Sequence, residues 1–117
     1  MLERLFHLAA NKTSVRQETV AGLTTFAAMA YILAVNPLIL STTGMPLPAL
    51  ITATALAAAL MTAVMALATN YPIALAPGMG LNAFFAFTLC KGLAIPWPAA
   101  LGLVFYSGVL FALLTLT

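Results

Sequence analysis

Long apolar stretches of about twenty residues dominate the chain and are separated by short segments that contain proline, glycine or charge. A helix needs roughly 20 apolar residues to cross a hydrocarbon core about 30 Å thick. This pattern predicts spans at residues 20–40, 48–69 and from 97 to at least 116. It also predicts a third, broken span between residues 73 and 90. The expected fold class is an all-α membrane protein with four transmembrane spans, in which the third divides into a short extended segment and a half-helix.

The first eighteen residues form a segment distinct from the spans. Residues 1–10 place apolar side chains on one helical face, which is typical of a short helix lying in the cytoplasmic interface. Ser14 and Gln17 have the spacing of a capping box, which predicts that the first spanning helix begins near Val15. We therefore expect a cytoplasmic interfacial segment at 1–18 and a membrane region at 19–117. The interfacial face comprises Leu2, Leu5, Phe6 and Ala9.

Span one carries polar side chains that a simple lipid anchor does not require. Thr24 and Thr25 either bond back to carbonyls of their own helix or line a cavity. Asn36 either contacts a ligand or ion, or repairs the backbone near Pro37 and caps the helix end. Pro37 lacks an N–H and frees the carbonyl of Leu33, so we expect the helix to kink or end there.

Span two repeats small side chains every four positions. Such a stripe lets helices approach closely, so we expect span two to be an internal packing helix. The stripe comprises Thr54, Ala58, Thr62 and Ala66.

The third span is the anomaly of the pattern, because residues 71–85 combine two prolines and two glycines inside an apolar region. Irregular backbone at membrane depth is tolerated only where it is buried in protein or lines a cavity. We expect residues 73–76 to be extended and a half-helix to run from Gly80 to Leu89 or Cys90, followed by an outer loop at Lys91 and Gly92. A half-helix that begins inside the membrane directs unpaired N–H groups, here those of residues 79–83, and a positive dipole end into the protein.

The half-helix also carries side chains suited to a flat ligand. Asn82 offers both donor and acceptor groups for an amide-like edge, and the phenylalanines that follow offer surface for stacking. A packing notch at Gly78 and Gly80, with Asn82 as an interhelical bond, is the alternative interpretation. The combination favours a substrate site. Its predicted residues are Gly78, Met79, Gly80, Leu81, Asn82, Phe84 and Phe85, with Thr24, Thr25 and Asn36 as further candidates that line the cavity.

Composition and charge narrow the function. Hydrophobic residues make up 64% of the chain and charged residues 5%, far below the roughly 25% of soluble domains. Three basic residues precede span one, so we expect a cytoplasmic amino terminus, although Lys91 then falls outside. The basic residues flank a span and form no patch for nucleic acid. The sequence contains one cysteine and no acidic residue after Glu18, so we expect no catalytic residues, no metal and no cofactor.

At these residues the sequence resembles a known family. Residues 24–26, 30–32 and 35–37, followed by residues 70–85, are similar to the AzgA-like branch of the xanthine/uracil permeases, which transport hypoxanthine, guanine and adenine. The resemblance implies fourteen spans built as two inverted seven-span repeats, with a purine held between broken spans three and ten. Residues 73–76 would then be the strand of span three, residues 78–81 the start of its half-helix, and Asn82 a purine contact. The acidic substrate and proton-coupling residues of the family lie in spans eight and ten, outside this chain.

The sequence therefore predicts an N-terminal fragment of a purine nucleobase–cation symporter in the cell membrane. The chain ends inside an apolar segment, which agrees with a continuation. Expected partners are a purine nucleobase, a coupling cation, taken to be H⁺, the lipid bilayer and the remaining spans of the same protein, with a homodimer left open. Two alternatives stay open: an anion transporter of the same architecture, and a small four-span structural membrane protein. Asn82 and the phenylalanines fit a planar neutral purine better than a compact anion.

Overall fold

The computed structural model describes residue 7, residues 10–71 and residues 73–117. Most of the predicted interfacial helix at residues 1–10 lies outside these described residues. His7 is not helical and has a φ of 49°. His7 itself is therefore not part of a regular α-helix, because a positive φ interrupts one.

The described part of the chain is helical and contains no strand. In chain order its elements are α2 (Val15–Met29), α3 (Ile32–Ser41), α4 (Leu47–Thr69), α5 (Met79–Ala83), the π-helix η1 (Phe84–Gly92) and α6 (Trp97–Leu116). Three helical stretches of the described residues are long and apolar enough to cross a membrane, at Val15–Ser41, Leu47–Thr69 and Trp97–Leu116. The predicted limits of spans two and four are confirmed to within one residue.

The first span begins at the residue that its predicted cap indicates, but its helix is interrupted before Pro37 and not at Pro37. The hydroxyl of Ser14 accepts a hydrogen bond from the N–H of Gln17 at 3.3 Å, which confirms this half of the predicted capping box. The break lies at residues 30–31, whereas Pro37 sits inside α3. Of the two predicted outcomes at Pro37, a kink or an end of the helix, the end is therefore wrong. Pro37 is fully buried and Asn36 nearly so, and the packing of this turn outweighs the loss of one backbone hydrogen bond.

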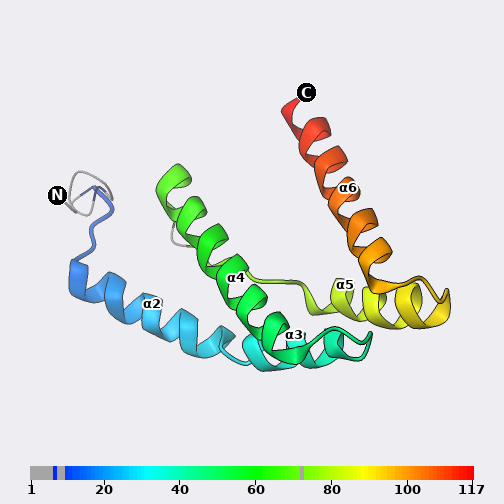
Figure 1. Cartoon of the computed structure of the whole chain (residues 1–117). Coiled ribbons are helices and arrows are strands. Elements are labelled where there is room, and N and C mark those ends of the chain that lie inside the picture. Colours follow the sequence, from blue (N-terminus) through cyan, green and yellow to red (C-terminus); the bar gives the residue numbers. More distant parts are fainter. Residues whose placement is uncertain (1–6, 8–9, 72) are drawn as a thin grey trace.

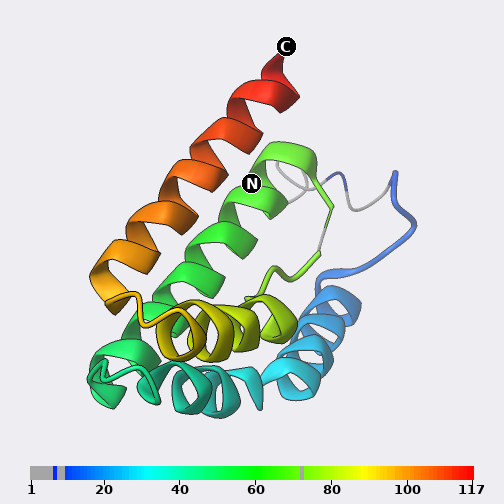
Figure 2. The ribbon, with the colours of Figure 1, turned by 90° about the vertical axis from the view of Figure 1, so that its right-hand side faces the viewer.

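Helices α3, α5 and η1 form a layer, and helices α4 and α6 extend from it (Figures 1 and 2). α5 and η1 lie beside α3, and α4 and α6 both run away from this layer toward the same side (Figures 1 and 2). The core lies at one end of the layer, where the turn after α3 meets η1 and the start of α6. Its buried side chains are Met45, Phe85 and Ala100, and Leu40, Leu50, Leu89, Cys90 and Ile95 pack against them.

The half-helix continues further than the sequence indicated. The sequence predicts that the half-helix ends at Leu89 or Cys90, but η1 continues to Gly92. The expected loop at Lys91 and Gly92 is therefore helical. In a π-helix each N–H bonds to the carbonyl five residues earlier. The N–H of Leu93 donates to the carbonyl of Thr88 at 2.9 Å and prolongs this pattern. At Gly92 an added Cβ would lie 3.2 Å from the Phe87 carbonyl oxygen, so this end of η1 favours glycine.

The turn between α3 and α4 generates a stability prediction. Gly44 has a φ of 93°, and an added Cβ would meet nothing within 4 Å, so only the backbone conformation disfavours a side chain. We expect Gly44→Ala to lower the free energy of unfolding of the complete protein in detergent by about 1–2 kcal/mol. Gly22→Ala, inside α2 and equally open, is the matched control and is expected to cause no loss. Equal stability of Gly44→Ala and the parent protein would contradict this account of the turn.

Candidate functional site

The described residues between α4 and α5, 70–71 and 73–78, form neither helix nor strand. Residues 73–78 run as an irregular segment toward the start of α5, and Gly78 has an extended conformation (Figure 1). The predicted non-helical segment before the half-helix is therefore present. The resemblance implied a strand at residues 73–76, and no strand is formed there in this chain.

One hydroxyl of α4 satisfies the backbone of this segment. The Oγ1 atom of Thr62 accepts from the N–H of Leu75 at 3.0 Å and lies 3.3 Å from the Leu75 carbonyl oxygen, to which it donates. A backbone group without a partner at membrane depth costs several kcal/mol. Thr62 thus replaces, at one residue, the two bonds that a neighbouring strand would make.

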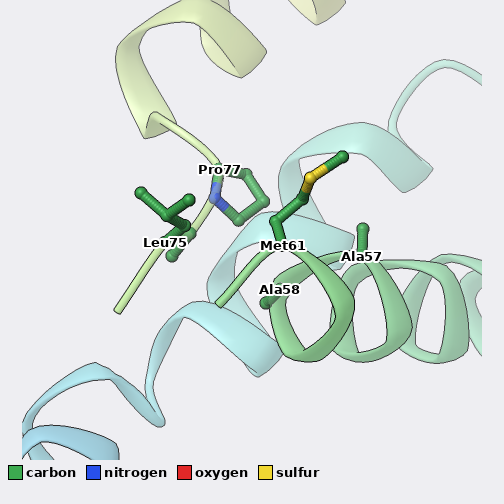
Figure 3. Close-up of a pocket in the computed structure, with 6 residues that line it drawn as sticks. Ala57, Ala58, Met61, Leu75 and Pro77 are labelled. Carbon is green, nitrogen blue, oxygen red and sulfur yellow. The ribbon is translucent and has the colours of Figure 1, made fainter. Parts of the chain in front are cut away.

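An apolar groove of about 260 Å³ lies between α4 and the irregular segment. Pro77 and Leu75 lie on one side of it, opposite Met61 and Ala58 of α4 (Figure 3). The predicted binding residues begin after Pro77 and do not line this groove. The full lining comprises Ala57, Ala58, Met61, Leu75, Ala76 and Pro77.

A hydrogen-bonded chain of three side chains joins α3, α4 and α5. The Nδ2 atom of Asn82 donates to Oδ1 of Asn36, and Nδ2 of Asn36 donates to Oγ1 of Thr54 at 3.0 Å. Asn36 is 2% exposed and Thr54 is 6% exposed, whereas Asn82 is only half-buried. Asn36 therefore bonds neither a bare helix end nor the backbone near Pro37. It links the half-helix to α4.

The predicted substrate residues divide into two groups. Gly78, Gly80 and Leu81 are exposed, Met79 and Asn82 are half-buried, and Phe84 is exposed. An added Cβ at Gly78 or Gly80 would meet nothing within 4 Å, so the approach to the backbone is open in this chain. Phe85 is 5% exposed and belongs to the core. Its position gives it a packing role, and a substrate contact by Phe85 stays a prediction.

Thr24 and Thr25 bond to their own helix. Their hydroxyls donate to the carbonyls of Val20 and Ala21 at 2.8 and 3.0 Å, which is the first of the two predicted alternatives. Both residues are exposed on α2.

Sequence reasoning missed the roles of Thr54 and Thr62, which it treated only as members of a stripe of small side chains. The stripe does face the rest of the chain, since Thr54 is buried and the other three members are half-buried. The sequence signal that could have indicated these roles is that two of the four small side chains of the stripe are threonines. Two hydroxyls recur among alanines on the face that the broken span must pass, where backbone donors and acceptors need partners.

The arrangement offers amide, hydroxyl, backbone and aromatic groups for binding. Among the described residues no group of three or more His, Cys, Asp or Glu could hold a metal ion. Lys91 lies at the far end of η1, where its Nζ is 5.3 Å from the centroid of the Phe87 ring. The charged side chain of the described half-helix, Lys91, thus lies over Phe87 and not beside Asn82.

Comparison with known proteins identifies relatives over nearly the whole chain. Residues 16–117 match the sequence model described as "Permease family", of the xanthine and uracil permeases. A Methanocaldococcus jannaschii protein named as a permease is 54% identical over 99% of this chain and 27% of its own length. The guanine/hypoxanthine permease PbuO of Bacillus subtilis is 50% identical over 97% of this chain and 27% of its own, and the adenine permease AdeP of Escherichia coli is 46% identical over 99% and 26%.

The chain thus spans about a quarter of the length of the curated relatives that it matches. No solved structure matches it. These relatives are transporters by name and not enzymes, which agrees with the interpretation of the sequence as a membrane transporter.

The double hydrogen bond of Thr62 yields a testable prediction. Thr62→Val removes both partners of Leu75 at nearly constant volume, so we expect a loss of about 1–2 kcal/mol in the free energy of unfolding. Backbone amides at residues 73–78 of the complete protein should then exchange hydrogen faster. The control is Thr115→Val, whose hydroxyl bonds only within α6, to the Phe111 carbonyl at 2.8 Å. Unchanged exchange at residues 73–78 would show that the segment does not depend on Thr62.

Proposed function

The chain belongs to the permease family of the xanthine and uracil permeases, and from this premise we propose that it is part of a secondary active transporter for purine nucleobases. Relatives named as guanine/hypoxanthine and adenine permeases support hypoxanthine, guanine and adenine as the substrate class. The described membrane-spanning helices and the family match support a multi-pass membrane protein, of which this chain would be one part. The location proposed for it is the cell membrane, with the amino terminus in the cytoplasm.

The proposed architecture assigns four spans to this chain. Residues 15–41 form span one, α4 span two and α6 span four, whereas residues 73–92 form a third span broken before α5. In this proposal the four spans belong to the substrate-binding domain of a protein with two inverted seven-span repeats. The remaining spans would supply the opposite wall of the site and the groups that couple transport to a cation, proposed to be H⁺. The complete protein would act as a monomer or as a homodimer.

One observation carries the substrate assignment: a half-buried amide, Asn82, stands at the start of a half-helix directly after a break in the span. The exposed ring of Phe84 lies on the next turn, and the backbone at Gly78 and Gly80 is open. An amide edge matches the alternating donors and acceptors of a purine, and an aromatic face can stack on its ring. In the proposed site, Gly78, Met79, Gly80, Leu81, Asn82 and Phe84 contact the substrate.

The two other functions have less support. A compact anion would be held here by backbone N–H groups alone, because the cationic side chain of the described half-helix, Lys91, lies at its far end over Phe87. A structural four-span protein does not account for relatives that are named as permeases.

Uptake measurements test the function directly. Cells that produce the complete protein should accumulate labelled hypoxanthine, guanine or adenine faster than cells without it. A proton uncoupler should abolish the accumulation if H⁺ is the coupling ion, whereas persistent accumulation would assign the coupling to another cation. An absence of uptake for all three purines, with the protein present in the membrane, would refute the proposal.

Asn82→Ala tests the proposed contact. Loss of one or two hydrogen bonds to a bound purine should lower kcat/KM for uptake by about tenfold or more. Membrane abundance is measured in parallel, because Asn82 also bonds Asn36. Asn11→Ala, in the turn that precedes α2, provides an asparagine control at a distance along the chain from the half-helix. Uptake kinetics of Asn82→Ala equal to those of the parent would remove Asn82 from the site.

A further inference from the structure

The chain of hydrogen bonds from Thr54 through Asn36 to Asn82 has a direction. An amide presents a carbonyl oxygen on one side and an NH₂ group on the other, and the network around it decides which side faces which partner. Here Thr54 accepts from Asn36, and Asn36 in turn accepts from Asn82. The nitrogen of Asn82 is therefore directed at Asn36, and the Asn82 amide can reverse only if the Asn36 amide reverses with it and the Thr54 hydroxyl changes from acceptor to donor.

Burial makes this orientation firm. Asn36 and Thr54 are nearly inaccessible, so water does not offer alternative partners to either side chain. Reversal of the Asn82 amide would place its oxygen against the Asn36 oxygen, and Asn36 would have to rotate as well to relieve the clash of two acceptors. A reversal thus requires two coupled rotations, one of them inside the protein.

The orientation matters because purines of the two classes present opposite edges. Hypoxanthine and guanine carry a donor at N1 and an acceptor at position 6, whereas adenine carries an acceptor at N1 and a donor at position 6. For a purine held in one pose by the rest of the site, an amide edge held in one orientation pairs with one of these two edges and places like groups against the other. A polar group left unpaired in a site of this kind is the strongest means of rejecting a close analogue.

We infer that Thr54 and Asn36 are positioning residues that determine substrate specificity: they hold the amide of Asn82 in one orientation, which makes the site discriminate between 6-oxo and 6-amino purines. The inference rests on the proposed function, because it takes Asn82 to be a purine contact. It assigns no substrate contact to Asn36 or Thr54. Both act through Asn82.

The experiment compares two substrates on the same protein. The ratio of kcat/KM for labelled hypoxanthine and adenine is measured in cells that produce the complete protein, and it does not depend on how much protein reaches the membrane. The parent is expected to show a ratio at least about tenfold from unity. Thr54→Val, which keeps the shape of Thr54 and removes its oxygen, should move the ratio about tenfold toward unity. Asn36→Leu, similar in size to asparagine, should do the same.

The matched control is Thr52→Val, on the same helix. Thr52 is exposed, and its hydroxyl donates to the carbonyl of Pro48 at 3.1 Å, outside the network. Its ratio is expected to stay within about twofold of the parent. Thr54→Ser restores a hydroxyl at the same position and should recover most of the parent ratio.

The outcomes separate this inference from the proposed function. Equal loss of uptake for both purines in Thr54→Val and Asn36→Leu, with an unchanged ratio, would show that the network only supports the fold and would overturn the inference. A parent that transports both classes equally would overturn it as well. A parent that transports no purine would instead refute the proposed function. Unaltered uptake by Asn82→Ala would refute the contact on which the inference rests.

Discussion

Backbone groups in an apolar environment need partners within the protein, and the break before α5 is the place where this chain has to meet that requirement without a helix. Residues 73–78 have no helical ladder and, in this chain, no neighbouring strand. The hydroxyl of Thr62 takes up the donor and the acceptor of Leu75 together. The irregular segment is therefore tied to α4, and the position of α4 becomes a condition for the geometry of the half-helix.

α4 supports the broken span at two points on one face. Thr54 and Thr62 are eight residues apart, which corresponds to roughly 12 Å along a helix. Thr62 binds the irregular segment at Leu75, before the half-helix begins. Thr54 is linked through Asn36 to Asn82 of the half-helix itself. Ala58, between the two, has a side chain small enough for the segment to approach. From sequence alone this stripe is assigned to close packing. In the structure Ala58 packs against the segment, whereas Thr54 and Thr62 form hydrogen bonds.

Properties that depend on local composition could be predicted from the sequence. Hydropathy fixed the limits of α4 and α6, and the cap at Ser14 fixed the start of α2, because each depends on residues close in the chain. Local composition does not indicate the break at residues 30–31, the continuation of α3 through Pro37 or the extension of η1 to Gly92. Both α3 and η1 pack against other helices, and such contacts are not visible in the sequence. Phe85 illustrates the same limit. Phe84 and Phe85 look equivalent in sequence, and only the packing against Met45 and Ala100 separates an exposed ring from a core residue.

The same packing explains why a site on this half-helix needs further protein to enclose a ligand. One face of the half-helix is fixed, since Phe85 and Ala86 are buried and Asn82 is bonded to Asn36. The other face carries Phe84 and Leu81, and Leu81 is 77% exposed. A large apolar side chain left open beside a half-buried amide is a surface that lipid alone would not satisfy, because the amide would then face hydrocarbon. In the proposed architecture the second repeat covers this face, so that the half-helix provides a preorganised wall and binding of the purine is completed by residues beyond this chain.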